Sequence, residues 1–73
     1  MTEYHINIFY SPEDDGFIAD IPDLVTCSAF GDTPAEALAA VEAARDAWLT
    51  TAQEEGMPIP EPRYRPAIYR AAV

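Results

Sequence analysis

Basic side chains are scarce in this sequence, which contains no lysine and four arginines against thirteen acidic residues. The formal net charge of −9 disfavours direct binding to nucleic-acid phosphates, because that binding depends on clustered lysine and arginine. A negative field raises the encounter rate with positively charged proteins, although many domains are acidic for solubility alone. The charge therefore favours a basic protein partner over DNA or RNA.

Residues for covalent cross-links and metal sites are equally few. Cys27 is the single cysteine and His5 the single histidine, so neither an internal disulfide nor a zinc site is expected. No run approaches ~18 apolar residues, and no basic segment precedes an apolar run at the start. These absences predict a cytoplasmic protein without a membrane segment, metal or cofactor.

The length of 73 residues allows one domain with a thin core, because a chain of this size buries only roughly 60% of its unfolded surface. With 49% hydrophobic residues, the composition is that of a folded protein. A thin core that must accommodate several aromatic rings leaves apolar surface exposed. We therefore expect a homodimer, a higher homo-oligomer or a complex with another protein.

Alternating apolar and polar residues from Tyr4 to Tyr10 predict a half-buried strand. The next segment, Ser11 to Gly16, collects serine, proline, aspartate and glycine and predicts a hairpin turn. A second strand is expected from Phe17 to Ile21 and must end at Pro22, which cannot donate to a ladder. A third strand is expected from Val25 to Phe30.

A helix start is encoded between Thr33 and Glu36. The Thr33 hydroxyl can accept from the Glu36 N–H, Pro34 suits the first helical position, and the Glu36 side chain can reach back to the Thr33 N–H. Gly56 is a natural stop, so the helix should span about 34 to 55. Its apolar stripe comprises Ala37, Leu38, Val41, Ala44, Trp48, Leu49 and Ala52.

These elements predict an α+β fold, a three-stranded antiparallel sheet with one long helix packed on one face. The domain should cover residues 1–62, followed by an extended C-terminal tail or edge strand over 63–73, with the strand around Ala67 to Tyr69. The tail could stack on single-stranded RNA, but its three arginines make a poor phosphate track, and pairing with acidic neighbours or a second subunit is favoured. These arginines and their interleaved tyrosines are Arg63, Tyr64, Arg65, Tyr69 and Arg70.

A set of short motifs occurs in a fixed order along the chain. They are Gly16-Phe17, Asp20, Pro22-Asp23-Leu24, Cys27, Gly31-Asp32-Thr33, Glu36-Ala37 and Pro58-Ile59-Pro60. In this order they resemble the HicB family of antitoxins from toxin–antitoxin pairs, most specifically over Ile21 to Ala39. The likeness runs from Tyr4 to about Pro62.

The resemblance implies a partial RNase H-like fold that binds and masks a HicA-type toxin, a small basic mRNA-cleaving protein. Family members often carry Pro-Gly where this chain has Val25-Thr26, so a different turn is expected there. Many also continue into a DNA-binding domain, for which a chain ending at Val73 leaves no room, so operator binding is not carried over. The alternative is an orphan, homo-oligomeric HicB-like module with no toxin.

Catalytic interpretations receive less support. Metal-dependent nucleases hold their acids on adjacent strands, whereas here Asp20 alone falls within a predicted strand. The acids predicted to lie in turns are Asp14, Asp15, Asp23 and Asp32, of which Asp32 more simply supports the turn and the positive end of the helix dipole. We therefore predict a protein that is not an enzyme, with candidate partner-binding residues unassigned.

Three further residues have a packing interpretation and a functional one. Cys27 is expected in the core, because a nucleophilic thiol needs a base and His5 lies on another strand. Trp48 is expected to pack in the core, with an interface anchor as the alternative. Phe9 shares the face of His5, which indicates that the outer surface of the first strand is an interface.

Overall fold

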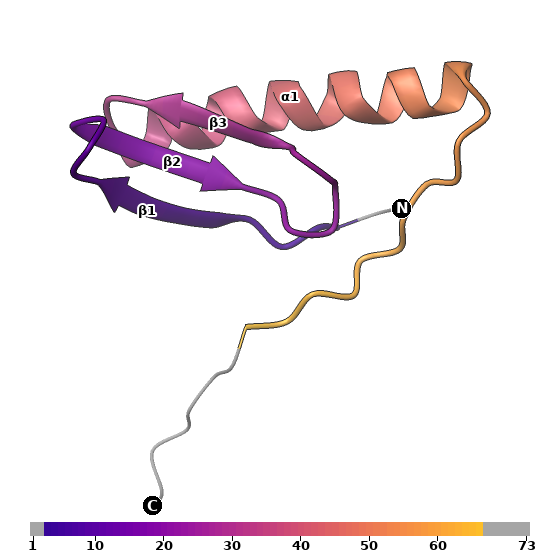
Figure 1. Cartoon of the computed structure of the whole chain (residues 1–73), viewed down its shortest axis with the longest axis horizontal. Helices are drawn as coiled ribbons and strands as arrows, with labels where there is room; N and C mark the ends of the chain where they lie inside the picture. The colour runs from indigo at the N-terminus through magenta and orange to yellow at the C-terminus, as the bar shows by residue number, and fades with distance from the viewer. Residues whose placement is uncertain (1–2, 67–73) are drawn as a thin grey trace, which may run out of the picture.

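Three strands and one helix make up the computed structural model, which describes residues 3–66 (Figure 1). The elements are β1 (Asn7–Ser11), β2 (Gly16–Asp20), β3 (Ser28–Gly31) and α1 (Pro34–Glu54). The strands form one antiparallel sheet in the order β1-β2-β3. This arrangement confirms the predicted α+β fold, while the edge strand expected around Ala67 to Tyr69 lies outside the described residues.

The register divides the strand residues between two faces of the sheet. Ile8 lies opposite Ala19, which lies opposite Ala29, and Ala19 is completely buried, so these three residues face the helix. The neighbouring row faces away from the helix. We call it the outer row, and it consists of Phe9, Ile18 and Phe30.

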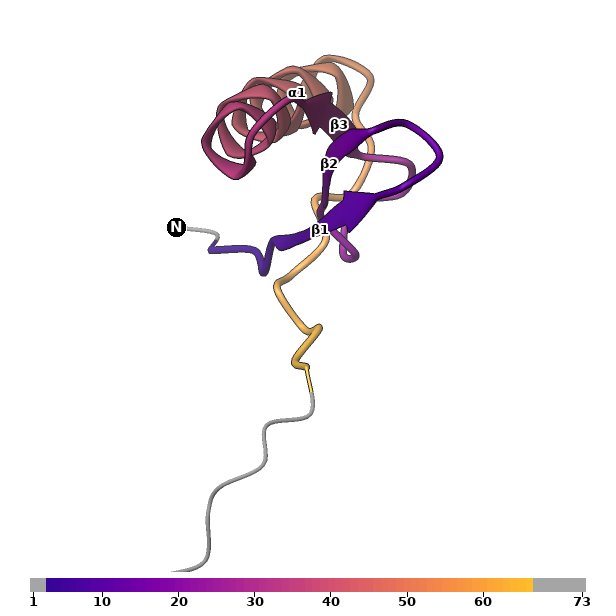
Figure 2. The same ribbon diagram turned by 90° about the vertical axis from the view of Figure 1, so that its left-hand side faces the viewer.

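The helix lies over β2 and β3 and leaves β1 at the margin of the sheet (Figure 2). The stripe predicted on the helix is confirmed, because all seven of its residues are buried or half-buried. The buried cluster between the two layers consists of Ala19, Ile21, Leu24, Cys27, Ala37 and Val41. No helix within residues 3–66 combines the length and the apolarity that crossing a bilayer requires.

Two predicted strand starts are wrong. The first strand begins at Asn7 rather than Tyr4, and the third begins at Ser28 rather than Val25. The third strand is shortened because consecutive turns occupy the segment before it: the Leu24 N–H donates to the Ile21 carbonyl at 3.1 Å, and the Cys27 N–H donates to the Leu24 carbonyl at 3.1 Å. These turns direct Leu24 and Cys27 into the core.

The junction between β3 and α1 is built largely as predicted. Thr33 is the N-cap, and its hydroxyl accepts from the Glu36 N–H at 3.1 Å. The Glu36 carboxylate, however, accepts from the N–H of Asp32 at 3.0 Å rather than from that of Thr33. Gly31 explains the shift, because it has no Cβ and so lets the end of β3 approach the first helical turn. A Cβ at this position would lie 2.3 Å from the Ala37 nitrogen.

The chain leaves α1 through Gly56, whose φ of +69° favours glycine, and then passes the start of the chain (Figure 1). The Tyr4 hydroxyl donates to the Pro60 carbonyl. The Asp23 carboxylate accepts from the backbone N–H groups of Arg63 and Tyr64 at 3.2 Å. The described part of the tail is thus tied to the start of the chain and to the turn after β2.

Candidate functional site

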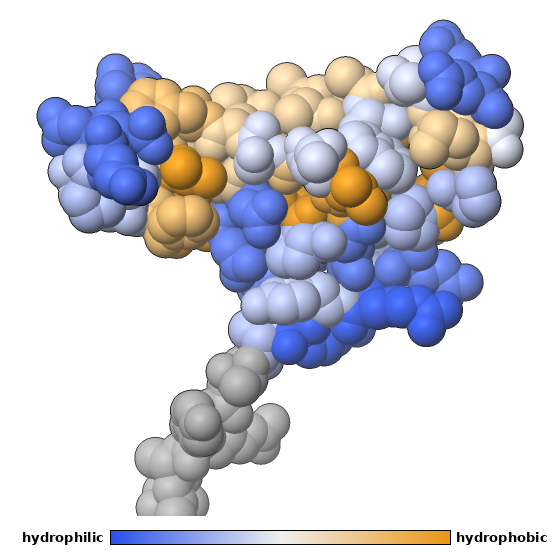
Figure 3. Space-filling model, viewed as in Figure 1, coloured by the Kyte–Doolittle hydropathy of each residue, from blue (hydrophilic) through white to orange (hydrophobic). Residues whose placement is uncertain are grey.

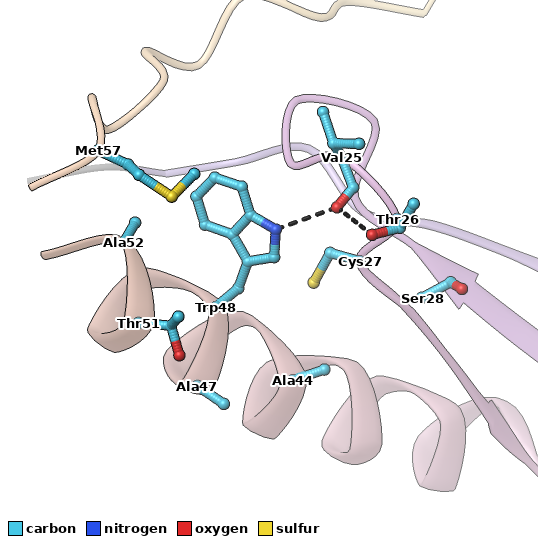
Figure 4. Close-up of a pocket in the computed structure, with 10 residues that line it drawn as sticks. All are labelled: Val25, Thr26, Cys27, Ser28, Ala44, Ala47, Trp48, Thr51, Ala52 and Met57. Carbon is cyan, nitrogen blue, oxygen red and sulfur yellow. Dashed lines mark hydrogen bonds between the residues drawn. The ribbon is translucent and has the colours of Figure 1, made fainter. Parts of the chain in front are cut away.

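A groove of about 550 Å³ lies between the C-terminal half of α1 and the segment that leads into β3 (Figure 4). We call it the Trp48 groove, after the large side chain at its centre. Its walls are mostly apolar and come from two parts of the chain that are distant in sequence. The lining residues are Val25, Thr26, Cys27, Ser28, Ala44, Ala47, Trp48, Thr51, Ala52 and Met57.

One hydrogen bond joins the two walls of the groove. The indole N–H of Trp48 donates to the Val25 carbonyl at 3.0 Å, and the Thr26 hydroxyl donates to the same oxygen at 2.6 Å (Figure 4). Because the polar atom of the indole is satisfied inside the protein, the ring presents apolar surface to the groove. Trp48 therefore packs against the core, as predicted, and also lines the candidate site.

The rim of the groove exposes large apolar side chains. Val25 is 72% exposed and Met57 is 46% exposed. The helical wall between them carries small side chains, including Ala44 and Ala47, which leave room for a side chain from a partner. An apolar groove with small residues on one wall is suited to receive apolar side chains rather than a charged ligand.

Cys27 lines the groove but is only 3% exposed. Burial raises the pKa of its thiol, the negative charge of Asp20 raises it further, and the positive charge of Arg45 only partly opposes them. His5 is engaged elsewhere, hydrogen-bonded to the Asn7 side chain at 2.6 Å. The thiol is thus held in its protonated, weakly nucleophilic form.

The acidic residues are spread over the surface of the molecule. All of them are exposed except Asp20 and Asp23, which are half-buried. Within residues 3–66 one ion pair forms, between Arg45 and Asp46 at 3.1 Å, and no three histidine, cysteine or acidic residues lie close enough to share a metal ion. Most of the negative charge is therefore not neutralised within the described part of the chain.

Apolar and acidic surfaces lie close together. In the space-filling view, apolar patches over the strands and along the helix are bordered by hydrophilic residues at the hairpin end and along the tail (Figure 3). Exposed apolar side chains bordered by unpaired charge are typical of protein-binding surfaces. This arrangement can hold another protein through apolar contacts while its charge attracts a basic one.

The residues of the sequence motif serve mainly to build the domain. Leu24, Cys27 and Ala37 are buried, and Gly31 permits close approach of β3 to the first turn of α1. The Thr33 hydroxyl caps the helix by accepting from the Glu36 N–H, and the Glu36 carboxylate accepts from the Asp32 N–H. Pro22 and Asp23 form the turn after β2, and Asp23 also holds the tail. Of the whole motif, Cys27 alone lines the Trp48 groove.

Sequence reasoning assigned no partner-binding residues and missed Val25, Met57 and the small helical residues of the groove. Val25 was placed in a strand, where it would have been paired, and the turns before Ser28 expose it instead. Alanine carries no functional signal of its own. The interface-anchor alternative for Trp48 was the clue that the sequence offered to this site.

Comparison with known proteins gives one relevant match. The chain is 38% identical over 53 residues to UPF0150 protein ssl0259 of Synechocystis sp., and the match covers 73% of each chain. No protein-family profile matches the chain, and no solved structure matches it.

Proposed function

The chain belongs to the UPF0150 family, and from this premise we propose that it is a HicB-like antitoxin domain that binds and occludes a HicA-type toxin. The motif from Ile21 to Ala39 and the net charge of −9 both support this assignment. The partner would be a small, basic, mRNA-cleaving protein. Its activity would be blocked by stoichiometric binding in the cytoplasm, where the single free Cys27 stays reduced.

The Trp48 groove is the observation that carries the proposal. Its two walls are joined by the hydrogen bond from Trp48 to Val25, so the groove exists before a partner binds. A preformed apolar groove reduces the ordering cost of binding, and the exposed acidic residues accelerate encounter with a basic protein. The apolar contacts supply affinity, and the charge supplies partner selection.

The proposed activity is binding without catalysis, cofactor or direct contact with nucleic acid. The protonated Cys27 thiol and the dispersed acidic residues support this part of the proposal. Electrostatic attraction to the toxin should weaken as salt rises, because exposed charges are screened beyond about 8 Å at physiological ionic strength. Binding that persists at high salt would measure the apolar contribution.

Co-expression with a small basic HicA-type protein tests the proposal. The informative variant is Ala47→Arg, which fills the groove and places a positive charge against a basic partner. The matched control is Ala39→Arg, because Ala39 is also exposed on α1 but lies about 12 Å earlier along the helix axis, outside the groove.

Wild type and Ala39→Arg should co-purify with the toxin and rescue growth, whereas Ala47→Arg should bind about 100-fold more weakly, equivalent to about 2.7 kcal/mol. Calorimetric titration would measure the difference. Equal binding by the two variants would remove the groove from the proposal. Failure of the wild type to co-purify or to rescue growth would reject the antitoxin function for that pair.

The alternative function is an orphan homo-oligomeric HicB-like module without a toxin. It is favoured by the exposed apolar residues of β1, which lie away from the Trp48 groove. A neighbouring reading frame that encodes no short basic protein, together with stable self-association, would support it over the antitoxin assignment.

A further inference from the structure

A second hollow, of about 300 Å³, lies between the turn that joins β1 to β2 and the strand β3. We call it the Phe30 hollow. Ile18 and Phe30 belong to the outer row, so its apolar part lies on the face of the sheet away from α1. The lining residues are Asp14, Ile18, Ser28, Ala29 and Phe30.

Gly16 fixes the position of the aromatic wall of this hollow. A Cβ at Gly16 would lie 2.6 Å from Cε1 of Phe30, so the Phe30 ring lies directly against the backbone of this glycine. Phe30 is nevertheless 47% exposed. The hollow therefore offers a ligand an aromatic surface that is in place before binding.

Asp14 supplies the charged side chain of the lining. Its carboxylate accepts from the Ser11 hydroxyl at 2.9 Å, and its N–H donates to the Ser11 carbonyl at 3.2 Å, so the turn holds it in place. The Ser11 hydroxyl is neutral and leaves the negative charge of Asp14 uncompensated. The ion pair found within residues 3–66 joins Arg45 to Asp46, and four arginines cannot neutralise thirteen acidic residues. The charge at this hollow therefore suits a cation.

An aromatic ring next to a carboxylate selects one type of side chain. A purely apolar side chain would displace water from the Asp14 carboxylate without compensating its charge. An arginine instead lays its methylene groups on apolar surface, stacks its planar guanidinium on an aromatic ring and donates hydrogen bonds to a carboxylate. Lysine fits an aromatic surface less well, because its ammonium group is compact and strongly hydrated.

We propose that the Phe30 hollow binds an arginine side chain of a basic protein, with the guanidinium against the Phe30 ring and the Asp14 carboxylate. Ser28 lines both this hollow and the Trp48 groove, so the two sites are neighbours along β3. One basic protein can therefore place apolar side chains in the groove and an arginine in the hollow. The proposal goes beyond the antitoxin function, since arginine binding is tested without any toxin.

Nuclear magnetic resonance titration of the full chain with acetyl-arginine-amide tests the proposal. Acetyl-citrulline-amide is the matched probe, because citrulline has nearly the shape of arginine without its charge. We expect saturable shifts in the backbone amide signals of Asp14, Ile18 and Phe30 with the arginine probe, and no saturable shifts with the citrulline probe. Absence of saturation with arginine, or equal shifts with both probes, would overturn the proposal.

Two variants separate the hollow from general attraction to an acidic chain. Asp14→Asn removes the charge but keeps an oxygen that can accept from Ser11, whereas Glu13→Gln removes the same charge from an exposed neighbour that does not line the hollow. Asp14→Asn should bind acetyl-arginine-amide about fivefold more weakly, as the loss of one exposed ion pair predicts. Glu13→Gln should bind as the wild type does. Equal binding by the two variants would contradict the assignment of the arginine to this hollow.

Phe30→Leu and Phe9→Leu test the aromatic contact. Both residues flank Ile18 in the outer row, and they are 47% and 50% exposed, but Phe9 does not line the hollow. Phe30→Leu should weaken binding about threefold, and Phe9→Leu should leave it unchanged. Equal effects would overturn the stacking on Phe30. If Phe30→Leu disturbs the fold, seen as lost dispersion of the amide signals, the comparison of Asp14→Asn with Glu13→Gln decides. A failure of the arginine probe would leave the antitoxin function standing, because its test reports on the Trp48 groove.

Discussion

The two ends of the helix differ in how fully they are closed. At the N-terminal end, Gly31 brings the strand against the helix and Thr33 and Glu36 satisfy backbone N–H groups. At the C-terminal end, a groove of about 550 Å³ separates α1 from the segment before β3, with Val25 and Met57 exposed on its rim. The most recognisable residues therefore build the scaffold, and the surface available to a partner is built from residues without a motif.

Gly31→Ala should destabilise the tightly packed junction between β3 and the N-terminal end of α1. The added Cβ would lie 2.3 Å from the Ala37 nitrogen and 2.7 Å from the Glu36 carbonyl carbon, and backbone atoms cannot move aside as a flexible side chain can. We expect a loss of about 3 kcal/mol in the free energy of unfolding, measured by urea denaturation. Gly56→Ala is the comparison, since its Cβ meets no atom within 4 Å and only its φ of +69° is unfavourable, at a cost of about 1 kcal/mol. Equal losses in the two variants would show that the junction is not tightly packed.

Thr33→Ala should weaken the same end to a smaller degree. It removes the oxygen that accepts from the Glu36 N–H at 3.1 Å, and we expect a loss of about 1 kcal/mol in the free energy of unfolding. Thr33→Ser keeps the oxygen and should keep most of the stability. If serine and alanine are equally destabilising, the hydroxyl does not act as the cap.

Thr26→Gly should have the smallest effect of the three substitutions, and it should stabilise the protein. Thr26 has a φ of +58°, in the left-handed region that disfavours a β-branched residue by about 1 kcal/mol, and glycine would remove this backbone strain. Glycine also adds conformational freedom to the unfolded chain, which offsets part of that stabilisation. We expect the free energy of unfolding to rise by about 0.5 kcal/mol. Thr26→Val keeps the unfavourable backbone without the hydroxyl and should give no gain. A loss with glycine would mean that the hydrogen bond to the Val25 carbonyl outweighs the strain.

The helix start was predictable because its signals are local. Thr33, Pro34 and Glu36 lie within four residues and act on each other's backbone, so the N-cap and the first helical position follow from the sequence. The Glu36 carboxylate was assigned to the wrong N–H because its partner depends on how closely Gly31 approaches the helix. That distance is a tertiary property.

The start of the third strand could not be predicted for a related reason. Val25 and Thr26 favour strands by local propensity, but burial of Leu24 and Cys27 is achieved by two consecutive turns, and the second of these contains Val25 and Thr26. The propensity of two residues was overridden by the burial of their neighbours. The candidate site was missed with the same residues, because the groove depends on those turns.

The sequence by itself determined the acidity, the order of three strands and one helix, and the N-cap of the helix at Thr33, since each depends on composition or on contacts between near neighbours. Tertiary structure alone decided that α1 covers β2 and β3 but not β1, and that Trp48 meets Val25 across a groove. Those features depend on contacts between residues far apart in the chain, such as Val25 and Trp48, which are separated by 23 in residue number. Periodicity predicts which side of an element is apolar, and packing decides which part of that side stays open to a partner.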